Sequence, residues 1–275
     1  MILVTGGSGC LGRALCELLP DVWAPDSREL DLGNASPVYA TVTSRRPSFI
    51  FHLGAMTDVD ACQMDPERAA RVNWLGTRAI ASAAGELGIP LAYLSTDYVF
   101  DGRKNLYTES DRPDPVNAYG MTKLMGEREV LRVRGSFVIR TSWVFGPGGR
   151  NFLSGFLDQA SEGKPLFAIV DQVSCPTYAP WLARELATLV ERPIPSGLYH
   201  LAGQVGVSYF DFVKKGLELA GLRAELAPCE RSELKRPAPR PAMSCLCSWA
   251  YGQVTGRAIP GWEQTLKEYV SWWKK

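Results

Sequence analysis

The chain of 275 residues is long enough for one large α/β domain, or for a nucleotide-binding domain with a smaller appendage. Its hydrophobic content of 46% and charged content of 21% are typical of a globular protein with a substantial core. The net charge of +1 gives no reason to expect nucleic acid or an anionic membrane surface as a partner, and no apolar run reaches the length of a membrane span.

The cysteines and histidines argue against a metal centre. The seven cysteines include no Cys-x-x-Cys pair, and with only His52 and His200 no zinc-binding spacing is present. Met1 leads straight into apolar residues and glycines without a basic leader, so it is expected to belong to the fold. Reduced thiols in a cytoplasmic protein are the expectation.

A glycine-rich turn follows the first predicted strand, residues 2–4, and opens an amphipathic helix (TGGSGCLGRALCELLP). Gly7, Gly9 and Gly12 satisfy G-x-G-x-x-G, and Gly6 with Gly9 and Gly12 gives the wider G-x-x-G-x-x-G. Because glycine carries no side chain, backbone N–H groups at the helix N-terminus are able to approach a pyrophosphate. The strand before and the helix after these glycines therefore predict dinucleotide binding.

The second predicted strand, residues 22–24, leads to Asp26, twenty residues after Gly6. An acid at this position is suited to hold an adenosine ribose through its hydroxyls, which favours NAD. Arg28 is suited to receive a 2′-phosphate, which favours NADP. Both residues also fit as flanks of a turn, so the sequence leaves the choice between NADH and NADPH open.

Strand and helix patterns alternate through the rest of the first half of the chain. This alternation with short turns predicts an α/β fold built on a doubly wound parallel sheet, the Rossmann arrangement. His52 lies within an apolar strand and is expected to be a core histidine rather than a ligand. The predicted elements are a helix at 38–44, a strand at 49–53, a helical region at 57–88 interrupted near Pro66, a strand at 91–94, a helix from residue 118 and a strand at 137–141.

Four candidate ligand-binding stretches fall where predicted strands end. In a doubly wound sheet, ligands bind beyond the carboxyl ends of the strands. Residues 6–12, 52–55, 95–97 and 141–143 all stand at such ends. The sequence therefore predicts one site at one edge of the sheet.

Tyr119 and Lys123 stand four residues apart in the helix that begins near residue 118 (AYGMTKLMGEREVL). On a helix this spacing places both side chains on one face, about 6 Å apart along the axis. Because a nearby ammonium stabilises phenolate, we expect Lys123 to lower the pKa of Tyr119 and make it a better proton donor or acceptor. Residues 95–97 supply a hydroxyl suited to orient a substrate carbonyl. The spacing alone also fits a surface tyrosine beside a solvated lysine.

The composition changes after the first half of the chain. We expect residues 1–147 to form the dinucleotide-binding domain and residues 148–275 to form mainly a substrate-binding lobe, with segments around 168–202 returning to the sheet. The tail (PGWEQTLKEYVSWWKK) reads as an amphipathic helix. Its expected core residues are Trp262, Leu266, Tyr269 and Val270.

Several longer segments together resemble the extended short-chain dehydrogenase/reductases and, more narrowly, the dTDP-4-dehydrorhamnose reductase family. The likeness spans nearly the whole chain, and STDYVFDG with the DQ…PT segment is more specific than the glycines. It implies a Rossmann domain with a smaller C-terminal substrate-binding lobe, NADPH or NADH as cofactor and a nucleotide sugar as substrate. The segments are TGGSGCLG, HLGAMTDVDACQMDPERAARVNWLGT, YLSTDYVFDG, YGMTKLMGE, IRTSWVFGPGGRNF and DQVSCPTYAPWLA.

The resemblance also implies residue roles. Thr96, Tyr119 and Lys123 would be catalytic: the nicotinamide delivers hydride to carbon 4 of the keto sugar, Tyr119 protonates the alkoxide and Thr96 binds the carbonyl oxygen. Trp143 would pack on the deoxyhexose, although core packing also fits this residue. The expected substrate-binding residues are Thr96, Asp97, Tyr98, Trp143 and Asn151. The expected cofactor-binding residues are Gly6, Gly9, Cys10, Leu11, Gly12, Asp26, Arg28, Asp31, Leu32, Leu53, Gly54, Ala55, Tyr119 and Lys123.

Two alternatives stay open beside the reduction of dTDP-4-dehydro-L-rhamnose to dTDP-L-rhamnose. One is a related nucleotide-sugar 4-reductase or epimerase. The other is a non-catalytic dinucleotide-binding subunit that resembles the regulatory subunit of methionine adenosyltransferase. The resemblance is compatible with a homodimer, and some family members use magnesium at a dimer contact, but no acidic cluster in this sequence requires that ion.

Overall fold

Six parallel strands form the central sheet of the computed structural model, which describes residues 1–149, 151–192 and 194–275. The strand order is β10-β5-β4-β3-β1-β2. Their buried apolar side chains explain why these segments form the middle of the fold. The predicted doubly wound parallel sheet is therefore confirmed. The strands are β1 (Ile2–Thr5), β2 (Val22–Trp23), β3 (Phe49–His52), β4 (Leu91–Thr96), β5 (Phe137–Thr141) and β10 (Gly197–His200).

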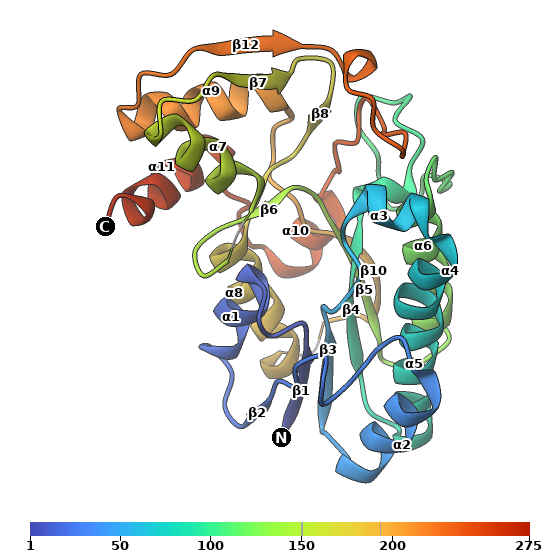
Figure 1. The fold of residues 1–275 in the computed structure, drawn as a ribbon. Coiled ribbons are helices and arrows are strands. Elements are labelled where there is room, and N and C mark those ends of the chain that lie inside the picture. The colour runs from blue at the N-terminus through green and yellow to red at the C-terminus, as the bar shows by residue number, and fades with distance from the viewer. Residues whose placement is uncertain (150, 193) are drawn as a thin grey trace.

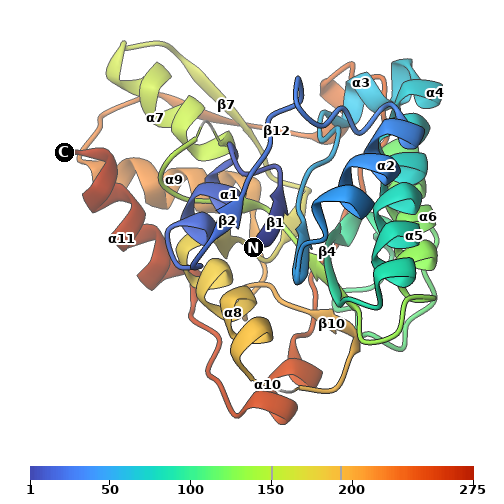
Figure 2. The same ribbon diagram turned by 90° about the horizontal axis from the view of Figure 1, so that it is seen from below.

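Helices cover both faces of the sheet. Helices α1 and α8 pack together on one face, and α2, α5 and α6 pack side by side on the other (Figures 1 and 2). These helices are α1 (Cys10–Cys16), α2 (Ala35–Arg45), α3 (Val59–Met64), α4 (Pro66–Ala69), α5 (Thr77–Leu87), α6 (Ala118–Val130) and α8 (Ala179–Glu191), with a π-helical segment η1 (Ala70–Gly76) and a 3-10 turn η2 (Asp97–Val99). Within the described residues, no helix has the length and apolar character needed to span a bilayer.

The predicted helical region before β4 is interrupted at Pro66, as expected. Helix α3 ends at Met64, and the Asp65 side chain caps α4, where Pro66 occupies the first turn. The sequence did not predict that the following turn widens into the π-helical segment η1. The π-helical turn places the buried Asn73 beside the loop that follows β3.

The strand order creates a switch point between β1 and β3. From β1 the chain moves outward to β2, then returns to the other side of β1 as β3 and continues to β4 and β5. Connections on opposite sides of the sheet leave a crevice at the carboxyl ends of these two strands. The glycine turn after β1 and the turn after β3 therefore face each other.

The C-terminal part of the chain builds a smaller lobe above the strand ends (Figure 1). A parallel strand pair, β7 and β12, packs against α7 and α9, and α11 packs against α9. The remaining elements of the C-terminal part are β6 (Val144–Phe145), α7 (Phe152–Ser161), β7 (Leu166–Ile169), β8 (Val173–Ser174), β9 (Thr177–Tyr178), β11 (Val207–Ser208), α9 (Tyr209–Ala220), β12 (Leu226–Cys229), η3 (Arg231–Glu233), α10 (Trp249–Thr255) and α11 (Trp262–Trp273). Of these, α10 packs against strand β10 of the central sheet.

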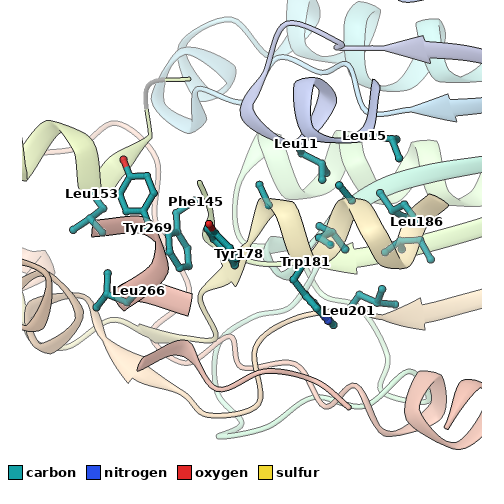
Figure 3. Close-up of a cluster of buried hydrophobic side chains, with 14 of the residues drawn as sticks. Leu11, Leu15, Phe145, Leu153, Tyr178, Trp181, Leu186, Leu201, Leu266 and Tyr269 are labelled. Atoms are coloured by element: carbon teal, nitrogen blue, oxygen red, sulfur yellow. The ribbon is translucent and has the colours of Figure 1, made fainter. Parts of the chain in front are cut away.

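One hydrophobic cluster runs from the sheet into the lobe (Figure 3). Leu11 of α1 lies toward α8, which contributes Trp181, and the cluster continues through Phe145 to Tyr269 of α11. The aromatic rings of Phe145 and Tyr269 meet edge to face at 5.7 Å. Of the expected tail core residues, Leu266, Tyr269 and Val270 are fully buried, and Trp262 packs partly buried against the cluster. This shared core fixes the lobe over the strand ends.

Candidate functional site

Two adjoining cavities open at the carboxyl edge of the sheet. The Asp26 cavity has a volume of about 400 Å³ and the Tyr119 cavity of about 370 Å³, and both are lined by Gly6 and Ala55. The Asp26 cavity collects the expected residues Gly6, Asp26, Asp31, Leu32, Gly54 and Ala55. The Tyr119 cavity collects Gly6, Gly9, Cys10, Leu11, Gly12, Leu53, Ala55, Thr96, Asp97, Tyr119, Lys123 and Trp143.

The glycines bring two turns into close contact. A Cβ atom on Gly12 would lie 2.2 Å from the Gly6 carbonyl oxygen, and one on Gly6 would lie 2.8 Å from the Gly54 nitrogen. Gly6 also has φ of 72°, a left-handed conformation that favours glycine. Side chains at these positions would close the cradle between β1 and β3, so the structure fits an extended dinucleotide along this edge.

At the far end of the cradle, Asp26 organises its own turn. Its Oδ1 accepts hydrogen bonds from the backbone nitrogens of Arg28 at 2.8 Å and Glu29 at 3.0 Å. Arg28 itself lies outside the cavity lining, whereas Arg68 of α4 lies within it. The arginine that lines the Asp26 cavity is therefore Arg68, which the sequence did not single out.

The π-helical segment fixes the turn after β3. Asn73 is 1% exposed; its Oδ1 accepts from the backbone nitrogen of Met56 at 2.8 Å, and its Nδ2 donates to the Met56 carbonyl at 3.0 Å. The same Nδ2 contacts the Thr122 hydroxyl at 3.2 Å. Asn73 thus ties the floor of the cofactor cradle to helix α6, one residue before Lys123.

Helix α6 begins where the sequence predicted, and two residues determine its position. The Asn117 side chain caps it by accepting from the Gly120 nitrogen at 2.8 Å. A Cβ atom on Gly120 would lie 2.0 Å from the Tyr98 carbonyl oxygen, so only glycine allows this close approach to η2. As a result Tyr119 and Lys123 face the same cavity, as their spacing predicted.

The expected lowering of the Tyr119 pKa is wrong in direction. Burial raises the pKa of the Tyr119 phenol, and this outweighs the opposite influence of Thr96. Burial also lowers the pKa of Lys123 to about 7, partly opposed by Glu127. The sequence showed the neighbouring charge but not the desolvation of both groups.

The Lys123 ammonium has two partners inside the protein. Its Nζ donates to the Leu94 carbonyl oxygen at 2.6 Å and lies 4.0 Å from the centre of the Tyr93 ring. These contacts hold a 2%-exposed lysine against strand β4. The protein's own contacts therefore hold this side chain on the wall of the cavity that Tyr119 also lines.

The Thr96 hydroxyl lies at the end of β4. It donates to Asp97 Oδ1 at 3.1 Å and accepts from the Tyr98 nitrogen at 3.2 Å. Burial raises the pKa of Asp97 to about 6, although hydrogen bonds from Ser244, Ser174 and Thr96 oppose this effect. A hydroxyl and a titratable carboxyl are thus placed together beside Tyr119.

Aromatic rings from both parts of the chain pack against the two aromatic residues, Tyr119 and Trp143, that line the Tyr119 cavity. Tyr98 meets Tyr119 edge to face at 6.0 Å, and its hydroxyl accepts from Gln172 at 3.0 Å. Trp143 has φ of 41°, a strained conformation for a tryptophan, and its ring meets Tyr209 of the lobe at 5.0 Å. Strain of this kind at a cavity wall is typical of a functional position rather than of core packing.

Asn151 and Tyr98, which were expected to bind the substrate, do not line the Tyr119 cavity. Asn151 caps α7: its Oδ1 accepts from the nitrogens of Leu153 and Ser154, and its Nδ2 donates to the Gly146 carbonyl and to Tyr269. Its amide is therefore engaged in structural hydrogen bonds, and it lies outside the cavity lining. Tyr98 also lies outside that lining, with its ring against that of Tyr119.

His52 is a core histidine, as predicted. It is 0% exposed, its Nδ1 bonds the Thr5 hydroxyl at 2.7 Å and its Nε2 bonds the Thr77 hydroxyl at 2.9 Å. Burial lowers its pKa to about 3. In the described part of the chain, no group of three or more His, Cys, Asp or Glu side chains is arranged to hold a metal ion.

Comparison with known proteins agrees with this geometry. The model of the RmlD substrate binding domain family matches residues 1–274. A dTDP-4-dehydrorhamnose reductase from Sinorhizobium fredii is 34% identical and covers 98% of this chain and 96% of the relative. One from Aggregatibacter actinomycetemcomitans is 35% identical over 97% of each protein.

A solved structure has the same fold over almost its whole length. The dTDP-4-dehydrorhamnose reductase from Bacillus anthracis, in complex with NADP, superposes with a TM-score of 0.93 at 32% identity. The match covers 98% of this chain and 97% of that one. The chain therefore belongs to the dTDP-4-dehydrorhamnose reductase family, and the resemblance predicted from its motifs is confirmed.

Proposed function

We propose that this protein reduces the 4-keto group of dTDP-4-dehydro-L-rhamnose with NADPH to give dTDP-L-rhamnose. One observation carries the proposal: Tyr119 and Lys123 face a cavity that the glycine cradle, Thr96 and Trp143 also line. A nucleotide cradle and a proton donor thus line one cavity. The relative from Bacillus anthracis, which was solved with NADP, supports the choice of cofactor.

The cofactor, when bound in the cradle, supplies hydride to carbon 4 of the sugar. The chain's own groups supply the proton and the geometry. Because burial raises the pKa of Tyr119, its phenol stays protonated at neutral pH and is ready to protonate the alkoxide. A protonated phenol is the form that reduction requires, whereas oxidation of an alcohol requires phenolate.

Lys123 and Thr96 support this proton transfer. The ordered Lys123 ammonium lies on the same helix face as Tyr119, where it stabilises negative charge as the proton leaves. Thr96 lies in the same cavity, where its hydroxyl binds the substrate carbonyl oxygen. Trp143 presents an aromatic face suited to the apolar methyl side of a deoxyhexose.

The lobe over the strand ends is proposed to hold the rest of the nucleotide sugar, with residues 1–147 as the dinucleotide-binding domain. The shared hydrophobic cluster supports a lobe that stays in place above the cavity. A cytoplasmic location is part of this proposal. The seven cysteines are all free, which fits a reducing compartment.

The test is the oxidation of NADPH and NADH, followed at the nicotinamide absorbance, with dTDP-4-dehydro-L-rhamnose generated in situ. Stoichiometric oxidation is expected, and with 4-deuterated NADPH the product should carry deuterium at carbon 4 of the sugar. An epimerase would change the sugar without net oxidation of cofactor. Cofactor binding without turnover of any keto sugar would contradict the proposal and favour a regulatory subunit.

A further inference from the structure

The Glu127 carboxylate lies one helical turn beyond Lys123, on the same face of helix α6. Both side chains reach strand β4 at consecutive residues. Lys123 Nζ donates to the Leu94 carbonyl oxygen at 2.6 Å, and the Ser95 hydroxyl donates to the carboxylate of Glu127. Glu127 is 1% exposed and Lys123 is 2% exposed. A negative and a positive charge are thus buried next to each other, away from the screening effect of water.

A second cation, Arg140 of strand β5, binds the same carboxylate. Its Nε and Nη2 donate to the two Glu127 oxygens at 2.9 Å and 2.7 Å. The guanidinium carbon lies 5.0 Å from the centre of the Phe100 ring, and Nη1 lies 3.5 Å from His200 Nε2. The carboxylate therefore faces two cations, one bonded to it directly and the other, Lys123, one helical turn away.

We propose that Glu127 is a positioning residue for the reduction, whose carboxylate keeps Lys123 in the ammonium form in the cavity that Tyr119 lines. Arg140, which bonds the same carboxylate, limits how much of its charge acts on Lys123. This inference rests on the proposed function, in which the ammonium stabilises negative charge on Tyr119 as the phenol proton leaves. A neutral amine at Lys123 carries no positive charge for this task, so turnover is expected to fall as the pH rises through the pKa of Lys123.

The reason lies in the cost of burying an ammonium. Desolvation favours the neutral amine, whereas a nearby negative charge favours the charged form. Burial lowers the pKa of Lys123 to about 7 even though Glu127 opposes this effect. Without the carboxylate, the pKa of Lys123 would fall below this value and the side chain would be mostly neutral at neutral pH. The carboxylate itself is kept ionised by the hydrogen bonds that Arg140 and Ser95 donate to it.

Other titratable groups near Lys123 must be separated from it. Burial lowers the pKa of the histidine to about 3, and it raises the pKa of the aspartate to about 6 and that of the thiol to about 11. Burial also raises the pKa of both phenols above the ordinary value of 10. Because none of these pKa values lies between 7 and 10, a fall of activity in that range reports Lys123. The groups are His52 of β3, Cys62 of α3, Tyr93 of β4, and Asp97 and Tyr119 of the cavity lining.

The kinetic test uses two substitutions that break the same ion pair but act on Lys123 in opposite directions. Glu127→Gln removes the negative charge, so the alkaline fall of kcat/KM, measured with saturating NADPH, should move to lower pH by about one pH unit. Arg140→Met removes the competing cation and leaves Lys123 as the remaining cation near the carboxylate, so the fall should move to higher pH. A loss of fold stability alone would lower activity in both variants without displacing the two profiles in opposite directions.

Glu185→Gln is the matched control, because it breaks a buried ion pair elsewhere. Glu185 is 3% exposed and pairs with Arg257, but it lies on α8, on the other face of the sheet from α6. This variant should lose stability without displacement of the alkaline fall. If Glu127→Gln fails to fold, Glu127→Met/Arg140→Met removes both charges and fills the space with apolar side chains, a replacement that buried ion pairs commonly tolerate. Its alkaline fall should lie below that of the parent, by less than one pH unit.

A second measurement needs no substrate. In protein labelled with carbon-13 at the lysine ε-carbon, an NMR titration gives the midpoint of Lys123 directly, and its signal is identified by its loss in Lys123→Met. The midpoint should move down in Glu127→Gln, move up in Arg140→Met and stay unchanged in Glu185→Gln. Equal midpoints in the parent, Glu127→Gln and Arg140→Met would overturn the inference whatever the activity. Displaced midpoints in a protein that reduces no keto sugar would sink the proposed function and, with it, the positioning role.

Discussion

The two ends of the proposed cofactor site are built in different ways. At the Asp26 end, a carboxylate bonds backbone nitrogens two and three residues further along, in an exposed turn. At the Tyr119 end, buried and half-buried side chains meet from strand β4, helix α6 and the loop after β5. Recognition of a ribose needs only a local turn. Proton transfer needs groups with shifted pKa values, and at the Tyr119 end burial is the largest cause of these shifts.

Burial at the Tyr119 end is supported by a neighbouring ion pair. Arg140 of β5 donates twice to the Glu127 carboxylate of α6, at 2.7 Å and 2.9 Å, and both side chains are almost fully buried. The negative charge of Glu127 partly offsets the cost of burying the Lys123 ammonium. The Tyr119 end thus depends on packing and charge far more than the Asp26 end does.

The largest effect is expected from Tyr119→Phe. Removal of the phenol hydroxyl eliminates the proton donor and should lower kcat by about 100-fold or more, the scale of a lost general acid. Cofactor affinity, measured by fluorescence titration, should stay close to that of the parent. Tyr199→Phe is the matched control, because its hydroxyl donates to the Pro195 carbonyl beside the far strand of the sheet. Near-normal turnover of Tyr119→Phe would remove this residue from the mechanism.

The next largest effect is expected from Gly12→Ala, in the glycine turn where the Asp26 end and the Tyr119 end of the proposed cofactor site meet. In Gly12→Ala the new methyl group would lie 2.2 Å from the Gly6 carbonyl oxygen, so the loop must shift. Overpacking of this kind costs about 1–3 kcal/mol, and we expect cofactor affinity to fall roughly tenfold. Gly85→Ala on α5 is the control, because a Cβ atom there meets nothing within 4 Å. Equal cofactor affinities in the two variants would exclude close approach at Gly12.

Lys123→Met should separate stability from activity. Burial lowers the pKa of Lys123 to about 7 from 10.5, so the folded state resists a proton that the unfolded state accepts. The destabilisation is fully present below pH 7 and fades as the pH rises toward 10.5. The variant should therefore unfold at a higher temperature than the parent at pH 6, by roughly 2–4 °C for each kcal/mol gained.

This gain should shrink at alkaline pH, while reductase activity is lost at every pH. Lys164→Met serves as the control because the Lys164 side chain is 61% exposed, and it should show no such pH dependence. A lower melting temperature for Lys123→Met at pH 6 would mean that the contacts with Leu94 and Tyr93 outweigh the desolvation of the charge.

The difference between local and long-range interactions at the two ends also explains which features could be predicted from the sequence. The glycine cradle, the parallel sheet and the pairing of Tyr119 with Lys123 depend on short spacings and on periodicity, which are visible in one segment at a time. The direction of the Tyr119 pKa shift was wrong because desolvation depends on the whole fold. The partners of Asp97 stand 77 and 147 residues away from it, at a separation that no local pattern encodes.

At the Asp26 end, there is a simpler reason why Arg68 was not predicted from the sequence. Arg28 was considered because it lies two residues from Asp26, but its backbone is held in the Asp26 turn and the residue lies outside the cavity lining. Arg68 follows the capping Asp65 at the start of α4, and it lines the cavity because α3 and α4 pack against α6. The position of that helix, rather than its sequence, places the arginine.

The smallest effects are expected from Asp26→Asn. Asparagine keeps the Oδ1 acceptor that the nitrogens of Arg28 and Glu29 require, so the turn should survive while one negative charge is lost. Loss of an exposed charge near a 2′-phosphate is worth about 1 kcal/mol or less. The ratio of kcat/KM for NADPH over NADH should therefore rise roughly two- to fivefold.

Arg68→Ala should move the same ratio in the opposite direction, because it removes the positive charge that lines the cavity. Arg28→Ala is the matched control: it deletes an arginine of the same turn that does not line the cavity, and it should leave the ratio unchanged. The measurement is initial rates with both cofactors at several salt concentrations, since exposed charges are screened by salt. A larger effect for Arg28→Ala than for Arg68→Ala would mean that the Asp26 turn rearranges around the cofactor, and that this end is less fixed than its hydrogen bonds indicate.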